Sequence, residues 1–254
     1  MAVIRIGILG ASGRMGRLLI REVAAGKGFA LSGATEAKGH RAIGQDAGVL
    51  AGLFRLGVAV SDDAAALMAA SDVVIDFTLP AVTVRHAKLA AKAGTAMVIG
   101  TTGFAPAEVK AIAAAARRVP IVQAPNMSLA VNLLFALTKR AAAVLDATYD
   151  ISISEIHHRE KRDAPSGTAL ALGAAAQAGR KKKGKPAKIP MVSIRAGDTA
   201  GEHTVLFAGE GERLELAHKA TSRQVFARGA VFAARWVKGK PPRLYDMADV
   251  LGLG

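Results

Sequence analysis

The sequence predicts an α/β protein with a doubly wound parallel sheet in its N-terminal half and an α+β domain with a mixed or antiparallel sheet in its C-terminal half. Two observations support this fold class. In the first half, short β-branched runs alternate with alanine-rich helical stretches, which is typical of βαβ units. After about residue 126, apolar and polar residues begin to alternate with period two, as they do in half-buried strands.

The N-terminal half predicts six strands and helices between most of them. The run Val73-Val74-Ile75 is apolar without alternation, as expected for a strand that helices cover on both faces. Ligands of such sheets bind at the carboxyl ends of the strands. The expected strands are Ile4–Leu9, Ala30–Thr35, Val58–Val60, Val73–Thr78, Ala96–Ile99 and Ile121–Gln123, and the expected helices are Arg14–Ala25, Ala64–Ala70, Val82–Ala93 and Pro106–Val119.

The C-terminal half predicts three helices and four strands, with the helices on one face of the sheet. We place the change of domain near Pro125-Asn126, where the βαβ rhythm ends. The expected helices are Leu129–Leu145, Gly167–Ala178 and Arg223–Val237, and the expected strands are Tyr149–Ile156, Met191–Arg195, His203–Ala208 and Arg213–Ala220.

The composition excludes several classes of site. The chain has 254 residues and no cysteine, which excludes disulfides, thiolate–zinc sites and a catalytic thiol. No apolar stretch reaches the ~20 residues that span a bilayer, and Arg5 interrupts the apolar run at the N-terminus as a signal peptide would not allow. We therefore expect a cytoplasmic protein with no membrane partner.

The formal net charge of +14 favours anionic small molecules, because a positive field over a cleft attracts them. Nucleic acid is the alternative, suggested by the basic run of residues 180–188. Glycine and proline interrupt that run, and no interleaved aromatic residues accompany it. We interpret residues 180–188 as a solvated loop and expect no nucleic-acid partner.

A glycine-rich turn, Gly10-Ala11-Ser12-Gly13-Arg14-Met15-Gly16, follows the first expected strand and opens a helix. Glycine lets the backbone approach a pyrophosphate, whose charge rests at the helix N-terminus. The spacing is G-x-x-G-x-x-G rather than G-x-G-x-x-G. Glu36 nevertheless lies 20 residues after Gly16, where an acid binds the adenosine ribose of a dinucleotide. Strand, turn, helix and acid together predict a Rossmann-type dinucleotide site.

The choice between NADH and NADPH stays open at this point. Glu36 would repel a ribose 2′-phosphate and so favours NADH, whereas Arg14 and Lys38 could compensate for that repulsion. Two further turns follow strands at the same edge of the sheet, and each is either an ordinary turn or a contact with the nicotinamide side of the cofactor. These turns are Gly100-Thr101-Thr102-Gly103 and Ala124-Pro125-Asn126-Met127.

A second cluster of polar residues surrounds two adjacent histidines. His157 ends an expected strand, and His158, the next residue, points to the opposite side. No third ligand is evident, so we expect no metal site. Glu155 shares a face with His157 and could orient its ring. Neighbouring cations disfavour the protonated form of Lys161, which suits a proton donor, although Glu160 and Asp163 oppose that effect.

An anion site is expected directly after this cluster. Ser166 is placed as the N-cap of the next helix, so that the N–H groups of Gly167 and Thr168 can hold a carboxylate. A helix N-terminus fed by a cationic loop binds small anions. The sequence therefore predicts an oxidoreductase that acts on an acidic substrate.

The string from Glu155 to Thr168, Glu-Ile-His-His-Arg-Glu-Lys-Arg-Asp-Ala-Pro-Ser-Gly-Thr, resembles the E-x-H-H-x-x-K-x-D-A-P-S-G-T signature of the 4-hydroxy-tetrahydrodipicolinate (dihydrodipicolinate) reductase family. The resemblance extends over nearly the whole chain, through Gly10–Gly16, Gly100–Phe104, Arg195–Val205 and Leu244–Leu251. It implies NADH- or NADPH-dependent reduction of a cyclic dicarboxylate in diaminopimelate and lysine biosynthesis. The family often has arginine directly after its ribose-binding acid, where this chain has Ala37.

The resemblance also implies roles for individual residues. His157 and Lys161 would be catalytic, and His158, Gly167 and Thr168 would bind the substrate. The cofactor would contact Gly10, Ala11, Ser12, Gly13, Arg14, Met15, Glu36, Gly100, Thr101, Thr102, Ala124, Pro125, Asn126 and Met127. Residues 1–125 would form the dinucleotide domain, on which residues 238–254 pack back as a closing helix, and residues 126–237 would bind substrate and build a homotetramer.

Two rival functions stay open on the sequence. One is a different nicotinamide dehydrogenase on the same fold, acting on another small acid. The other is a non-catalytic redox-sensing regulator that binds a dinucleotide and, through residues 180–188, nucleic acid.

Overall fold

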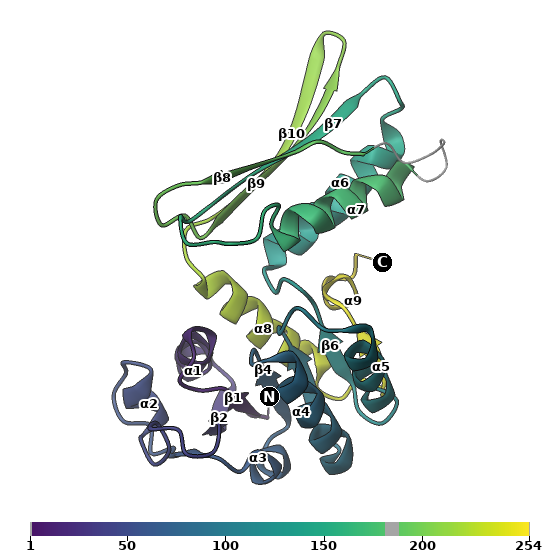
Figure 1. The fold of residues 1–254 in the computed structure, drawn as a ribbon. Coiled ribbons are helices and arrows are strands. Elements are labelled where there is room, and N and C mark those ends of the chain that lie inside the picture. The colour runs from purple at the N-terminus through teal and green to yellow at the C-terminus, as the bar shows by residue number, and fades with distance from the viewer. Residues whose placement is uncertain (1, 181–187, 254) are drawn as a thin grey trace. The chain divides into compact units, whose positions relative to one another are not determined.

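The computed structural model describes residues 2–180 and 188–253 and divides them into two compact units. Unit 1 consists of residues 2–127 and 224–252. Unit 2 consists of residues 128–180, 188–223 and 253. Each unit contains one sheet with its own helices, as Figure 1 shows.

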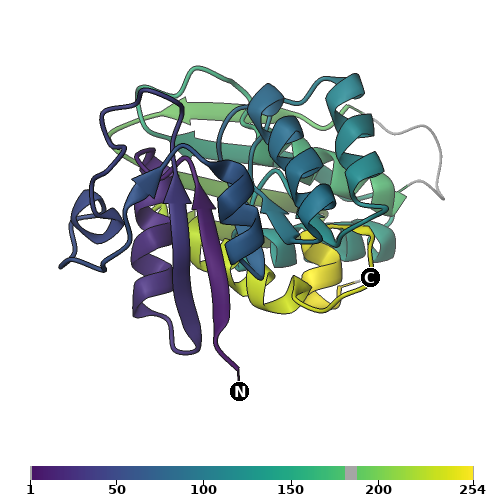
Figure 2. The ribbon, with the colours of Figure 1, turned by 90° about the horizontal axis from the view of Figure 1, so that it is seen from below.

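Unit 1 is built on a seven-stranded sheet in the order β11-β6-β5-β4-β1-β2-β3, in which all neighbours are parallel. Helices α1 and α8 pack on one face, and α3, α4 and α5 pack on the other (Figure 2). The strands are β1 (Ile4–Leu9), β2 (Phe29–Thr35), β3 (Val60–Ser61), β4 (Val73–Asp76), β5 (Ala96–Ile99), β6 (Ile121–Gln123) and β11 (Leu244–Tyr245). The helices are α1 (Arg14–Ala25), α2 (Ala47–Leu50), α3 (Ala64–Ala70), α4 (Pro80–Ala93), α5 (Pro106–Ala115), α8 (Gln224–Val237) and α9 (Met247–Leu251).

The sequence pattern explains this doubly wound sheet. All four residues of β4 are buried, because helices cover both faces of the strand. Helix α1 buries only one stripe, Leu19, Ile20 and Val23, as an amphipathic surface helix does. The six expected strands are present, with β3 displaced to Val60–Ser61. The expected doubly wound fold is confirmed.

Unit 2 contains a mixed four-stranded sheet in the order β10-β9-β7-β8. Strands β7 and β8 are parallel, and the other two pairs are antiparallel. The strands are β7 (Asp150–His157), β8 (Met191–Arg195), β9 (Gly201–Gly209) and β10 (Glu212–Ala220), and the helices are α6 (Leu129–Val144) and α7 (Gly167–Arg180). The helices bury one face of the sheet, where Ile153, Phe207 and Leu172 share a core. The expected mixed sheet with helices on one face is confirmed.

The structure corrects two expectations for the C-terminal part of the chain. Helix α8 packs on α1, β4 and β5 and belongs to unit 1, so the chain returns to that unit at Gln224 rather than at residue 238. Leu244–Leu251 is not a single closing helix, because Leu244 and Tyr245 form a strand parallel to β6 before α9 begins. Alanine and glycine on the buried face of α8 allow close packing against a sheet. The sequence predicts the helix itself but not which of the two sheets it packs on.

Candidate active site

The glycine turn of unit 1 joins β1 to α1. The N–H groups of Gly10 and Ala11 each donate to the Thr35 carbonyl at 2.9 Å, and Gly10 has a φ of 74°, which favours glycine. An ideal Cβ on Gly16 would lie 2.1 Å from the Gly10 carbonyl oxygen. The first turn of α1 therefore packs directly on the backbone of the loop, and Gly16 permits this contact.

Glu36 lies at the end of β2 beside this turn. Its Oε1 accepts hydrogen bonds from the Ser12 N–H at 2.7 Å and the Ser12 hydroxyl at 2.6 Å, and its Oε2 accepts from the Ala37 N–H at 3.1 Å. Burial alone would raise the pKa of Glu36, but these hydrogen bonds outweigh it and hold the pKa below its usual value. The carboxylate is therefore ionised at neutral pH, as an acceptor for ribose hydroxyls must be.

A cavity of about 610 Å³ adjoins the turn and Glu36. Such a volume lies within the range of small-molecule and cofactor sites. Two cationic side chains, Lys38 and Arg85, line it together with Glu36. The other residues that line it are Gly10, Ser12, Gly13, Thr35, Ala37, Asp62, Ala64, Phe77, Thr78, Leu79, Val82, His86 and Leu89. A tight glycine turn, an ionised acid and this volume fit a dinucleotide.

The remaining expected cofactor residues lie outside that lining. Arg14 and Met15 are the first residues of α1, and Ala11 is buried beneath the turn. The segments 100–102 and 124–127 follow β5 and β6, at the carboxyl edge where the sequence placed them. The Ala124 N–H donates to the Ile99 carbonyl at 3.2 Å, which ties the two segments together. Met127 is 1% exposed, so it packs in the core.

A buried acid that the sequence reasoning missed connects these loops. Asp76, the last residue of β4, is fully buried, and its Oδ1 accepts from the Thr78 N–H at 2.8 Å and the Thr78 hydroxyl at 2.6 Å. Its Oδ2 lies 2.7 Å from Nδ1 of His86 in the cavity wall. The Thr101 hydroxyl also donates to Oδ1 at 3.4 Å. One carboxylate thus holds the cavity wall and the loop after β5. The sequence feature that could have identified Asp76 is an acid at the end of a fully buried strand.

In unit 2, His157 is the last residue of β7 and is held by Glu155 on the same face. The Nδ1 of His157 contacts Oε2 of Glu155, whose side chain is fully buried. Arg195 on β8 donates to both oxygens of that carboxylate, at 2.9 Å and 2.8 Å. The expected orientation of the His157 ring by Glu155 is confirmed. Arg195 lies within the stretch Arg195–Val205 that resembles the family, but its pairing with Glu155 could not be predicted from the sequence.

The charges in this group are balanced. Burial would raise the pKa of Glu155, but the Arg195 guanidinium, the Ser193 hydroxyl and His157 overcome it and lower that pKa to about 2. Burial lowers the pKa of His157, and the nearby Lys161 and Arg195 add to this effect, while Glu155 opposes it. His157 is therefore a neutral imidazole beside an ionised carboxylate at neutral pH.

Lys161 lies in the loop between β7 and α7. Its Nζ donates to both oxygens of Asp163 at 2.8 Å. Arg195 holds the same loop by donating to the carbonyl oxygens of Lys161 at 3.3 Å and Asp163 at 2.6 Å. Asp163 is thus the direct partner of Lys161, whereas Arg159 and Arg162 are exposed.

The N-terminus of α7 follows this loop. The Ser166 hydroxyl accepts from the Ala169 N–H at 3.1 Å, which confirms the expected N-cap, and the Ser166 N–H donates to Oε1 of Glu155 at 3.1 Å. Gly167 is exposed, and a Cβ at that position would meet no atom within 4 Å. An anion can therefore reach the start of α7 at Gly167, close in the structure to the group that holds His157.

His158 is directed differently from His157, as the strand geometry predicts. Its N–H donates to the Thr199 carbonyl at 2.8 Å, and its Nε2 lies 3.3 Å from Nη2 of Arg223. His203 on β9, which the sequence did not single out, contacts both Ser166 and His157. Its Nε2 lies 3.0 Å from the Ser166 hydroxyl, and its ring meets that of His157 edge-on at 5.0 Å.

Protonation of His203 should make the protein sensitive to acid. Burial, with a smaller contribution from His157, lowers the pKa of His203 to about 4, against 6.5 for a free imidazole. The unfolded chain takes up the proton first as the pH falls, so the stability from this group is present above pH 6.5 and is lost between pH 6.5 and 4. The expected loss is about 3 kcal/mol of unfolding free energy.

Urea unfolding of the wild type and of His203→Gln at pH 7 and pH 4 measures this effect. The variant should lose less stability than the wild type over this range, because glutamine does not titrate. An equal loss in both proteins would contradict the assignment.

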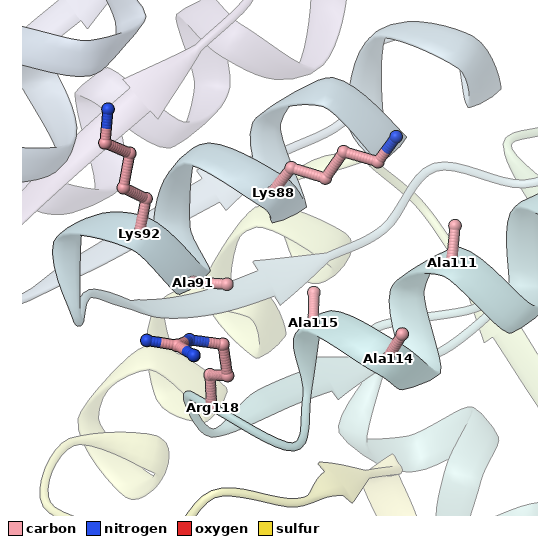
Figure 3. A pocket seen from close by; sticks show the side chains of 7 residues that line it. All are labelled: Lys88, Ala91, Lys92, Ala111, Ala114, Ala115 and Arg118. Atoms are coloured by element: carbon pink, nitrogen blue, oxygen red, sulfur yellow. The ribbon is translucent and has the colours of Figure 1, made fainter.

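A separate depression lies between α4 and α5 in unit 1 and has a volume of about 400 Å³. Figure 3 shows Lys88 and Lys92 on α4 and Arg118 just after α5 around it, with alanines between them. The alanine side chains offer no hydrogen bond to a ligand. The cavity beside the glycine turn, with its acid and backbone N–H groups, is the better match for a dinucleotide.

The other expectations concern charge and metals. Residues 181–187 of the basic run lie outside the described residues, and Arg180 donates to the carbonyl oxygens of Tyr149 and Asp146. Across residues 2–180 and 188–253, no group of three acidic or histidine side chains could hold a metal ion. No helix in this described part is long and apolar enough to cross a membrane.

Comparisons with known proteins agree over the full length of the chain. Residues 4–127 match the family model described as "Dihydrodipicolinate reductase, N-terminus", and residues 130–251 match the one described as "Dihydrodipicolinate reductase, C-terminus". The 4-hydroxy-tetrahydrodipicolinate reductase of Anaeromyxobacter sp. (strain Fw109-5) is 53% identical over 266 residues, which cover 99% of this chain and 98% of the relative. That of Beijerinckia indica is 49% identical over 269 residues, with 100% and 99% covered.

A solved structure extends the match to three dimensions. It is described as "Dipicolinate bound Dihydrodipicolinate reductase from Paenisporosarcina sp. TG-14", has a TM-score of 0.79 and 26% identity, and is matched over 96% of this chain and 97% of that one. Both units are covered by these matches, so neither rival function that the sequence left open is needed. The chain belongs to the 4-hydroxy-tetrahydrodipicolinate reductase (dihydrodipicolinate reductase) family of NAD(P)H-dependent oxidoreductases.

Proposed function

We propose that the chain reduces 4-hydroxy-tetrahydrodipicolinate to tetrahydrodipicolinate in diaminopimelate and lysine biosynthesis, with NADH or NADPH as the reductant. The observation that carries this proposal is in unit 2, where the open N-terminus of α7 adjoins the buried Glu155–His157 pair. A helix N-terminus binds carboxylates, and an imidazole beside it can exchange protons. A dicarboxylate that gains a proton needs both functions together.

The cofactor residues are proposed to act as the resemblance implies. Residues 10–15 would hold the pyrophosphate and Glu36 the adenosine ribose. Residues 100–102 and 124–126 would contact the nicotinamide side, whereas the buried Met127 would support them from the core. When bound, the reduced nicotinamide supplies a hydride to the substrate. The buried Asp76, which links the cavity wall to Thr101, would keep both ends of this site in register.

Use of both cofactors follows from the charges around the cavity. The ionised Glu36 accepts hydrogen bonds from ribose hydroxyls and repels a 2′-phosphate. Lys38 and Arg85 line the same cavity and offset that repulsion, even though Ala37 replaces the family's frequent arginine. We therefore expect NADH and NADPH both to support turnover.

The substrate would be held by residues of unit 2. One carboxylate would bind the N–H groups of Gly167 and Thr168, and His158 would contact the substrate from the preceding loop. The positive charge of this loop and of the helix N-terminus would stabilise negative charge as it develops on the substrate nitrogen. Lys161 would deliver the proton and His157 would act as acid and base, which requires Lys161 to leave its contact with Asp163 or to share it.

The assembly and location remain predictions. The face of the unit 2 sheet away from α6 and α7 exposes Val192 (59%) and Ile194 (43%) on β8. A homotetramer built through this sheet would bury those side chains. A cytoplasmic location is expected because the relatives are enzymes of amino-acid biosynthesis.

A steady-state assay tests the proposal. Purified enzyme, 4-hydroxy-tetrahydrodipicolinate and either NADH or NADPH should show loss of absorbance of the reduced nicotinamide, with kcat/KM for the two cofactors within about tenfold, equivalent to about 1.4 kcal/mol. No turnover with either cofactor would refute the function. A strong preference for NADH would refute only the argument from Lys38 and Arg85, and a strong preference for NADPH would refute only the argument from Glu36.

A further inference from the structure

The carboxylate of Glu155 is surrounded by hydrogen-bond donors. Its Oε1 accepts from Nη2 of Arg195 at 2.8 Å and from the Ser166 N–H at 3.1 Å, and its Oε2 accepts from Nη1 of Arg195 at 2.9 Å and meets Nδ1 of His157. The Ser193 hydroxyl adds another hydrogen bond. An ionised carboxylate accepts all of these bonds and donates none, so Nδ1 of His157 must carry the proton.

We propose that Glu155 and Arg195 form a positioning pair that fixes neutral His157 as its Nδ1–H tautomer, which leaves Nε2 as the atom that takes up or returns a proton. This inference rests on the acid–base role proposed for His157. Neither residue is proposed to touch the substrate. The same carboxylate holds the Ser166 N–H, so the tautomer of His157 and the start of α7 are set together.

The role of Arg195 is to let Glu155 orient the ring of His157 without favouring protonation of that ring. A lone carboxylate at Nδ1 favours an imidazolium, which has no free acceptor. Arg195 lies within hydrogen-bond distance of both oxygens and balances the charge of Glu155. The other groups that face His157 are Lys161 in the loop and His203 on β9, and neither supplies a negative charge.

The geometry at Nε2 is consistent with this assignment. A Cβ placed on Gly201 of β9 would lie 2.9 Å from Nε2 of His157. Glycine at this position therefore leaves space beside Nε2 that another residue would fill. The proton-exchanging atom is thus the ring nitrogen that Glu155 does not contact.

Glu155→Gln separates orientation from charge. The amide NH2 of glutamine must occupy one of the two carboxylate positions, and at either one it faces an Arg195 N–H. At the Oε1 position it also faces the Ser166 N–H, a backbone donor that cannot accept a hydrogen bond from it. At the Oε2 position it faces His157, which can respond by moving its proton to Nε2. Glutamine is therefore expected to switch His157 to the Nε2–H tautomer.

Long-range proton–nitrogen NMR spectra of histidine-labelled protein at pH 8 report the tautomer of His157 directly, and His157→Gln assigns its signal. We expect Nδ1–H in the wild type and Nε2–H in Glu155→Gln. The kcat of Glu155→Gln should fall by about 10²-fold or more, since a histidine in the wrong tautomer cannot accept the proton. NADH affinity, measured by fluorescence, should not change.

Glu202→Gln is the matched control. Glu202 is a carboxylate on the neighbouring strand β9 that pairs with Lys219 at 3.7 Å, and the same substitution there should leave tautomer and kcat unchanged. If Glu155→Gln does not fold, Arg195→Gln tests the same pair. It should raise the pH at which His157 titrates, because Glu155 then acts on the ring without a counter-charge.

The outcomes are distinct. The positioning pair would be refuted by any of three results. These are an Nε2–H tautomer of His157 in the wild type, an unchanged tautomer in folded Glu155→Gln, and an unchanged titration of His157 in Arg195→Gln. A switched tautomer with wild-type kcat would support the positioning of the ring and would refute the acid–base role proposed for His157.

Discussion

Replacing Lys161 with alanine is expected to lower kcat by about 10²- to 10⁴-fold, the range that a positioned general acid contributes. The side chain emerges from the loop between β7 and α7, and its Nζ is held by Asp163 rather than by a distant group. Its removal leaves the neighbouring Glu155–Arg195 pair intact. The loss should therefore appear in the chemical step.

Cofactor binding should be unaffected in Lys161→Ala, because every residue proposed to bind the cofactor lies in unit 1 and Lys161 lies in unit 2. Steady-state kinetics and NADH fluorescence titration measure the two effects separately. Lys219→Ala removes a lysine that pairs with Glu202 on the same sheet and should retain wild-type kcat. A near-normal rate in Lys161→Ala, or a loss of NADH binding, would contradict the proposed role.

Gly16→Ala is expected to have the largest effect on stability. The new Cβ would approach the carbonyl oxygens of Gly10 and Ala11 at 2.1 Å and 2.7 Å. Both are backbone atoms of a turn that is itself hydrogen-bonded to Thr35, so neither can move far. We expect a loss of about 3 kcal/mol in unfolding free energy, at the upper end for overpacking, and weakened NADH binding.

Gly13→Ala provides the contrast within the same turn. Its φ is −64°, which alanine adopts readily, and its Cβ would lie 3.3 Å from the Gly10 carbonyl oxygen. The unfolding free energy of this variant should lie within about 1 kcal/mol of that of the wild type. The variant should bind NADH more weakly, because the Cβ adds bulk to the turn expected to approach the pyrophosphate. Equal stability of the two variants in urea would contradict the close packing assigned to Gly16.

Local patterns predicted much of this fold. β1, α1, α3, β5, β6 and β8 have the expected bounds, because each is marked by a clear apolar run or by glycine and proline at its ends. The N-cap at Ser166 could be predicted because it bonds within the first turn of its own helix. The pairing of Glu155 with His157 could be predicted because residues two apart share a face of a strand. Such features depend on neighbours in the chain, which a sequence displays directly.

Features that join distant segments could not be predicted in this way. Arg195 is 40 residues from Glu155 and reaches it only because β8 pairs in parallel with β7. Asp76 and His86 meet because α4 returns past the end of β4. The placement of α8 failed for the same reason, since its buried stripe of small residues fits either unit equally well.

The return of α8 and β11 to the N-terminal sheet has a consequence for biosynthesis. During translation, residues 2–127 are made before residues 224–245. The part of their sheet that α8 covers and the outer edge of β6 therefore lack their partners until those later residues have been made. Until then a nascent chain exposes apolar surface and an unpaired strand edge, both of which promote aggregation. The later-made unit is inserted within the earlier one, so the first part to leave the ribosome is the last to be completed.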